Sequence, residues 1–207
     1  MKVKVLLDID GVIADFYSGF GGHLNKKLNA GLNLNKGPTN YSLHEWGHNI
    51  SREVIDKEIP KWVLDGGYAN MPIFPKAKEF VYKLMDKYDV HIVTARVGDF
   101  LCYLSGGVKD TIKRDTFKWL KKHGIPSDKL FFEHDKVNFC QKNRVPIVIE
   151  DKLPTVIDGA DEGIRCILMD RSWNQEQDGL KRDHFNIFVA YTYDDILQIL
   201  EELTSGS

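Results

Sequence analysis

The chain has 207 residues, of which 43% are hydrophobic and 28% are charged, and its formal net charge is −2. These proportions are typical of a folded globular protein and exclude a disordered chain. Proteins that bind long nucleic acids usually carry an excess of basic residues, which this chain lacks. It also contains no run of about 20 apolar residues, the length that would predict a membrane span. We therefore expect a small-molecule substrate and neither a membrane nor a long nucleic acid as a partner.

The cysteines and the start of the chain bear on the cellular compartment. Cys102, Cys140 and Cys166 lie far apart and form no Cys-x-x-Cys pair, which predicts free thiols in a reducing environment. The first residues enter an apolar run directly, without a signal-peptide pattern, so the expected location is cytoplasmic. A homodimer is left open.

Short apolar runs alternate with helical patterns along most of the chain. The apolar runs predict strands at residues 3–7, 90–93, 130–132, 145–149 and 166–169. Apolar residues that recur on one helical face predict helices at residues 76–87, 111–123, 155–162 and 193–203. This alternation predicts an α/β fold, a Rossmann-like parallel sheet with helices on both faces.

Residues 17–74 interrupt the alternation. They are rich in glycine, asparagine and aromatic residues and contain no strong strand pattern. We interpret them as a small, mainly helical cap inserted after the first strand, so that residues 1–16 and 75–203 form the core. Pro75 lies just before a predicted helix, where proline is well tolerated.

A carboxylate pair follows the first predicted strand. Asp8 and Asp10 are separated by one residue, and Gly11 allows the chain to bend so that both carboxylates reach one pocket. The carboxyl ends of strands in an open α/β sheet are where ligands bind. The alternative, a turn with solvated carboxylates, is the less favoured interpretation of this motif.

Two further motifs follow predicted strands at the same edge. Thr94 and Ala95 end the second strand, where a hydroxyl and backbone N–H groups can hold a phosphate oxygen. Glu150 and Asp151 end the fourth, and Lys136 lies between the two motifs. Four carboxylates in one pocket would repel each other, and a divalent cation with oxygen ligands removes that conflict.

The order of these motifs resembles that of the haloacid dehalogenase superfamily, over residues 3–169. The resemblance implies a Mg²⁺-dependent phosphatase that acts through an aspartyl-phosphate. It implies that Asp8 is the nucleophile and that Asp10 is the general acid and base. It further implies phosphate binding by Thr94, Ala95 and Lys136. Lys129 and Lys142 lie nearby, and Lys136 is preferred because it closely follows the strand predicted at residues 130–132. The metal ligands implied are Asp8, Asp151, Asp10 through its carbonyl and Glu150 through water.

Three segments resemble the 5′(3′)-deoxyribonucleotidases more closely: residues 11–16, 152–155 and 170–174. That resemblance implies a nucleoside monophosphate as substrate, with Phe16 stacking on the base. Arg96 and Trp46 are further candidates for substrate contacts. The chain departs from the mammalian members in two ways. They have serine directly after the threonine of the second motif, where this chain has Ala95-Arg96, and the segment at residues 97–113 is longer here than in those enzymes.

Aromatic residues of the cap have two interpretations. Tyr41, Trp46, Trp62 and Phe74 could line a nucleobase pocket, but such residues more often form a core.

Other functions remain open. His44-Glu45-Trp46-Gly47-His48 matches the H-E-x-x-H pattern of zinc peptidases, although Gly47 disfavours the helix that the pattern needs. A polynucleotide 3′-phosphatase, another small-metabolite phosphatase of the same superfamily and a catalytically inactive binding module are the remaining alternatives.

Overall fold

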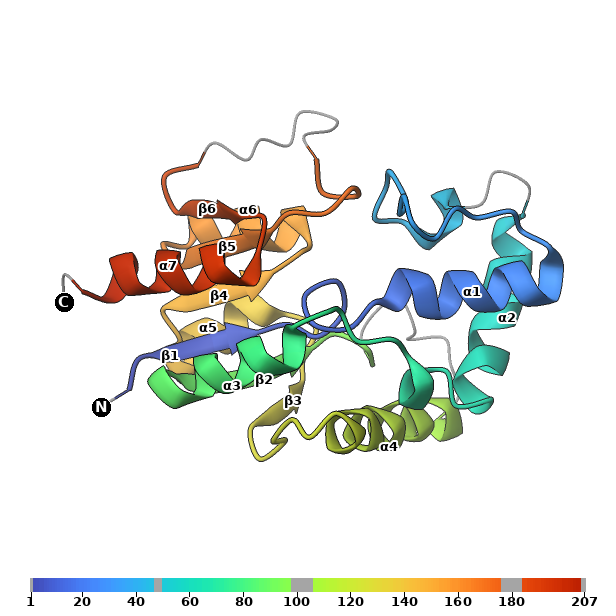
Figure 1. Ribbon diagram of the computed structural model, residues 1–207, viewed down its shortest axis with the longest axis horizontal. Coiled ribbons are helices and arrows are strands. Elements are labelled where there is room, and N and C mark those ends of the chain that lie inside the picture. Colours follow the sequence, from blue (N-terminus) through green and yellow to red (C-terminus); the bar gives the residue numbers. More distant parts are fainter. Residues whose placement is uncertain (1, 47–49, 98–105, 176–183, 206–207) are drawn as a thin grey trace.

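The computed structural model describes residues 2–46, 50–97, 106–175 and 184–205. Within them, one sheet of six parallel strands has the order β3-β2-β1-β4-β5-β6 (Figure 1). The strands are β1 (Lys4–Leu7), β2 (Asp89–Thr94), β3 (Leu130–Phe132), β4 (Ile147–Glu150), β5 (Arg165–Met169) and β6 (Ile187–Ala190). The predicted α/β fold with a parallel sheet is confirmed.

Helices cover both faces of the sheet. Helices α3 (Ala77–Lys87) and α7 (Tyr193–Thr204) pack together on one face, and α5 (Lys136–Asn143) and α6 (Leu153–Asp161) pack together on the other (Figure 1). Side chains along β1 alternate between the two faces. Val5 and Leu7 join one hydrophobic cluster and Leu6 joins the second, which explains why these three consecutive residues are all apolar.

The cap lies beyond the carboxyl ends of the strands (Figure 1). It contains α1 (Phe16–Leu28), the 3₁₀ turn η1 (Leu43–Glu45), α2 (Arg52–Leu64) and the 3₁₀ turn η2 (Tyr68–Asn70), all between β1 and β2. Its entry and exit run side by side, because the Asp15 N–H donates to the Pro72 carbonyl (2.9 Å) and the Phe74 N–H donates to the Ile13 carbonyl (3.0 Å).

Helix α4 (Gly106–Lys122) connects the core to the cap. It packs against α2 and η2, and the Trp119 indole N–H donates to the Met71 carbonyl at 2.7 Å. The cap is therefore fixed to the core by a helix that follows it in sequence.

The sequence-based elements are present with shifted boundaries, and two elements were missed. The strand predicted at 145–149 begins at Ile147, and the helix predicted from residue 111 begins at Gly106. The short edge strand β6 and the eight-residue helix α5 had not been predicted. Both are too short for a clear periodic pattern.

Two sequence expectations concern residue environment. Cys140 and Cys166 are buried free thiols, as predicted, and Cys102 lies outside the described residues. Among the described helices, none is both long enough and apolar enough to cross a membrane.

A buried histidine makes the stability of the fold depend on pH. His91 on β2 is 8% exposed, its ring stacks on Phe131 at 5.6 Å, and neither ring nitrogen has a hydrogen-bond partner among the described residues. Burial lowers its pKa below the ordinary value of 6.5; nearby Asp89 opposes this effect, while Lys129 and Lys4 add to it.

We expect His91→Leu to weaken the acid sensitivity of folding. Below about pH 6.5 the unfolded chain takes up a proton at residue 91 that the folded protein resists, so the free energy of unfolding of the wild type falls. The variant lacks this contribution. Urea unfolding of both proteins from pH 8 to pH 5 measures the free energy of unfolding. The difference between the two proteins at pH 8, where His91 is neutral in both states, gives the effect of the altered packing alone. Parallel pH profiles would contradict the prediction.

Candidate active site

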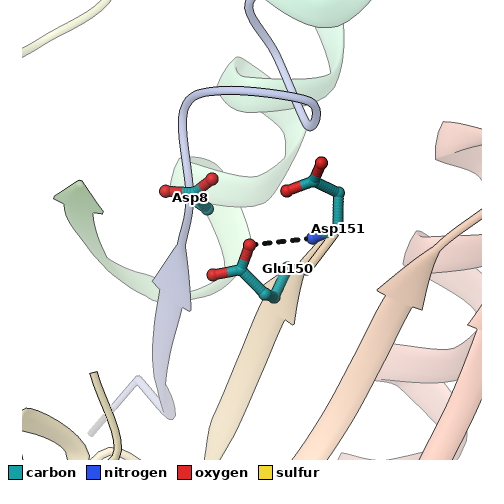
Figure 2. A group of neighbouring side chains, drawn as sticks. All are labelled: Asp8, Glu150 and Asp151. Carbon is teal, nitrogen blue, oxygen red and sulfur yellow. Dashed lines mark hydrogen bonds between the residues drawn. The ribbon is translucent and has the colours of Figure 1, made fainter. Parts of the chain in front are cut away.

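Three buried carboxylates meet where β1 and β4 end. Asp8 follows β1, Glu150 ends β4, and Asp151 comes next; each is at most 5% exposed. The Asp8 N–H donates to the Ile149 carbonyl at 3.0 Å, which ties the two strand ends together. One oxygen from each carboxylate lies within 4.8 Å of the others, and Figure 2 shows the three groups around a shared space.

Lys136 supplies a positive charge to this cluster. It lies in the first turn of α5, and its Nζ donates to Asp8 Oδ1 and to Glu150 Oε2, both at 2.5 Å. Lys129, which was considered for the same position, instead pairs with Asp89. The structure therefore brings together Lys136 and the two carboxylates that the motifs had suggested.

The charges in the cluster do not balance. Burial raises the pKa of Asp8 to about 7, with a further increase from Glu150 and an opposing effect of Lys136. Burial and the same neighbour Glu150 also raise the pKa of Asp151 well above its ordinary value. Burial alone would raise the pKa of Glu150 as well, but Lys136 and nearby N–H groups outweigh it and lower that pKa. Buried oxygen ligands with unbalanced negative charge fit a hard divalent cation such as Mg²⁺.

Gly11 lets the first motif approach the third. Its φ of +77° is in the left-handed region, and a Cβ at this position would lie 1.9 Å from Asp151 Oδ2. Only glycine allows both the backbone conformation and the contact. The bend brings Asp8 and Asp10 to the same pocket, as the sequence had predicted.

Arg96 is bound to Asp10. Its Nε and Nη2 donate to the two Asp10 carboxylate oxygens at 2.7 Å each, and its Nη1 donates to Thr116 Oγ1 at 3.0 Å. The guanidinium is buried and lies 4.7 Å from the Tyr68 ring centroid. Three of the five guanidinium N–H groups thus donate within the protein. The substrate contact expected of Arg96 stays a prediction.

The motifs line the floor of a pocket of about 460 Å³, and the cap lines the other side. Thr94, Ala95 and Lys136 lie on the floor, and Phe16 and Trp46 line it from the cap. The Phe16 and Trp46 rings meet edge to face at 5.8 Å. The pocket therefore combines a charged floor with aromatic walls.

The four cap aromatics singled out in the sequence have different positions. Tyr41 and Trp46 line the pocket. Trp62 is buried in the cap core against Phe20, and Phe74 lies under the Arg171 guanidinium at 4.2 Å. Trp62 therefore belongs to the cap core, while a contact of Tyr41 or Trp46 with a nucleobase stays a prediction.

The zinc-peptidase pattern does not form the helix it requires in its described part. His44 and Glu45 belong to η1, a three-residue 3₁₀ turn, and the His44 ring pairs with Asp56 at 2.9 Å. His48 lies outside the described residues.

The segment after β5 makes contacts that the sequence analysis missed. The Trp173 indole N–H donates to Asp151 Oδ2 at 2.7 Å, and Asn174 Nδ2 donates to the Asp151 carbonyl at 2.7 Å. Arg171 Nε donates to the Gly11 carbonyl at 2.6 Å. The only signal for these residues was the family resemblance of residues 170–174, which carried no role for individual side chains.

Solved structures with a similar fold are haloacid dehalogenase-like hydrolases. One from Streptococcus pneumoniae has a TM-score of 0.58 at 14% identity, covering 96% of this chain and 98% of that one. Another, from Deinococcus radiodurans with bound phosphate and sodium, has a TM-score of 0.59 at 14% identity, covering 96% and 95%. A magnesium-bound hydrolase from Bacillus subtilis has a TM-score of 0.57 at 16% identity, covering 97% and 99%. The chain thus has the haloacid dehalogenase fold.

The sequence itself narrows the class. Residues 1–189 match the family described as 5′ nucleotidase, deoxy (Pyrimidine), cytosolic type C protein. A protein of Chlorobaculum tepidum, named as a predicted 5′(3′)-deoxyribonucleotidase, is 25% identical in an alignment that covers 92% of each chain. The chain belongs to the 5′(3′)-deoxyribonucleotidase family of the haloacid dehalogenase superfamily, and it is a phosphomonoester hydrolase. The resemblance seen in the motifs is confirmed.

Proposed function

We propose that the protein hydrolyses nucleoside monophosphates, preferably deoxyribonucleotides, by transferring the phosphoryl group to Asp8. The observation that carries the proposal is the position of Asp8: it is buried beside Lys136 and two further carboxylates, at the floor of a pocket with aromatic walls. A nucleotide has the matching chemistry, a phosphate at one end and a flat base at the other.

The acidic cluster is the proposed Mg²⁺ site. Asp8, Glu150 and Asp151 would hold the ion together with the Asp10 carbonyl. When bound, Mg²⁺ supplies positive charge to the phosphate and to the attacking carboxylate. The raised pKa values of Asp8 and Asp151 support this assignment, because they reflect burial of carboxylates beside the negative charge of Glu150.

The reaction then proceeds in two steps. An Asp8 carboxylate oxygen attacks phosphorus while the ester P–O bond breaks, and protonated Asp10 gives its proton to the leaving alcohol. In the second step, Asp10 takes a proton from water as the water attacks phosphorus, and the bond to Asp8 breaks. Arg96 donates to both carboxylate oxygens of Asp10 and so fixes the orientation of the group that takes up this proton. Proton donation in the first step requires the Arg96 contact to loosen.

The remaining site residues position the phosphate and the nucleoside. We assign binding of the phosphate oxygens to Lys136, Thr94 and the backbone at Ala95. Hydrogen-bond donors held in place where negative charge develops on the phosphate lower the activation barrier. Residues 17–74 act as a cap over residues 1–16 and 75–203, and Phe16 and Trp46 supply the surface for the base. The family description as cytosolic supports a cytoplasmic location. We keep a homodimer as a proposal.

We expect Asp8→Asn to lower kcat by about four orders of magnitude or more, because the amide cannot act as the nucleophile. The thermal midpoint should stay the same or rise, since one charge leaves a repulsive cluster. Steady-state kinetics and thermal unfolding by circular dichroism measure the two effects. Turnover close to that of the wild type would rule out the covalent pathway.

We expect removal of divalent metal to stop turnover and added Mg²⁺ to restore it, because the buried carboxylates would otherwise repel the substrate phosphate. The measurement is activity after EDTA treatment and desalting, followed by titration with MgCl₂. Full activity in the metal-free protein would contradict the proposed site.

We expect Phe16→Ala to lower kcat/KM for a deoxyribonucleoside monophosphate by about ten- to a hundredfold, the loss of one base-stacking contact. Hydrolysis of p-nitrophenyl phosphate, which has no base, should change much less.

Phe20→Ala is the matched control for this substitution. Phe20 is fully buried and stacks on Phe16 at 6.0 Å, but it does not line the pocket. It should therefore report the effect of a loosened cap on both substrates alike. If Phe16→Ala lowers kcat/KM for both substrates by the same factor, Phe16 has only a packing role and the assigned base contact is wrong.

A further inference from the structure

Consecutive side chains after β5 contact separate parts of the site. Arg171 donates to the carbonyls of the loop after Asp10, and Asn174 donates to the Asp151 and Met169 carbonyls at 2.7 and 2.8 Å. Between them, Ser172 reaches the cap and Trp173 reaches Asp151. Residues 171–174, which we call the clamp segment, thus contact the first motif, the third motif and the cap.

Trp173 restricts the orientation of the Asp151 carboxylate. Its indole N–H donates to Asp151 Oδ2 at 2.7 Å, and Gly11 packs against the same carboxylate from another direction. Without these contacts, repulsion from Asp8 and Glu150 would favour rotation of the group away from the cluster. Hydrogen bonds from outside a metal site commonly orient its ligands in this way.

The cap contacts the residue next to Trp173. Ser172 Oγ donates to the Pro38 carbonyl at 2.7 Å. Gly37 comes so close that a Cβ there would lie 2.5 Å from Ser172 Oγ and 3.8 Å from the Trp173 ring. Gly37 and Pro38 belong to the cap segment between α1 and η1. The cap thus contacts Ser172, and the neighbouring Trp173 contacts the Asp151 carboxylate.

We propose that Trp173 is a positioning residue for the metal-binding carboxylate of Asp151, and that the contact of Gly37 and Pro38 with Ser172 holds Trp173 in place. Metal binding and cap docking then stabilise each other, since coupling between two sites is reciprocal. The inference rests on the proposed metal site, and it adds a route by which the cap influences that site.

The first test measures metal binding without substrate or turnover. Mn²⁺, which accepts the same oxygen ligands as Mg²⁺, is titrated into the metal-free protein while electron paramagnetic resonance reports the free ion. Trp173→Phe removes the N–H and keeps most of the ring, and it should weaken binding about ten- to a hundredfold.

Trp119→Phe is the matched control. It removes an indole N–H bond of the same 2.7 Å length, donated to the Met71 carbonyl and not to a carboxylate. Because this bond joins α4 to the cap, the variant can affect the metal site only through cap docking, and its Mn²⁺ affinity should fall much less than that of Trp173→Phe. Wild-type affinity in Trp173→Phe, or an equal loss in both variants, would overturn the positioning role.

The second test concerns the cap. Ser172→Ala should weaken Mn²⁺ binding by about fivefold, the factor expected for one ordinary hydrogen bond. If Ser172 acts through Trp173, adding Ser172→Ala to Trp173→Phe causes no further loss. Additive losses, or no loss in Ser172→Ala alone, would overturn the coupling to the cap.

Asp151→Asn separates this inference from the proposed function. Loss of Mn²⁺ binding in Asp151→Asn with normal binding in Trp173→Phe defeats the inference and leaves the metal site standing. Normal binding in Asp151→Asn defeats both.

Discussion

The burial of negative charge at the ends of β1 and β4 is the constraint on which the rest of the site depends. Asp8, Glu150 and Asp151 are almost inaccessible to solvent, and burying unpaired carboxylates is costly. The chain offsets part of that cost with the Lys136 ammonium group and with N–H groups donated to Glu150 and Asp151. The remaining excess of negative charge suits a divalent cation, the ion proposed for this site. The fold thus maintains an unfavourable arrangement that binding of such an ion would relieve.

The two carboxylates of the first motif, Asp8 and Asp10, pair with different cations. Lys136 contacts Asp8, whereas Arg96 contacts Asp10 through two parallel hydrogen bonds. Each cation therefore holds one carboxylate of the first motif. This separation suits a reaction in which Asp8 must attack as an anion while Asp10 exchanges a proton, because the two carboxylates then have different partners.

The parts of the structure that the sequence predicted are those with a local signal. The central strands appear as apolar runs because both of their faces are buried, and the carboxylates of the first and third motifs directly follow such runs. Lys136 could be chosen over Lys129 because it follows a predicted strand. In contrast, β6 and α5 were missed since they are short, and the Arg96–Asp10 and Trp173–Asp151 contacts join residues 86 and 22 positions apart. No periodicity or spacing encodes such contacts.

Those long-range contacts also explain how a cap inserted after the first strand can take part in the chemistry of the core. Tyr68 of the cap lies over the Arg96 guanidinium, which holds Asp10, and Pro38 of the cap accepts the hydrogen bond of Ser172, the neighbour of Trp173. The cap therefore reaches the first motif through Arg96 and the third motif through the clamp segment. A shift of the cap would therefore change the support of Asp10 and of Asp151 together. Closure of such a cap would exclude water in the same step that completes the arrangement of the carboxylates.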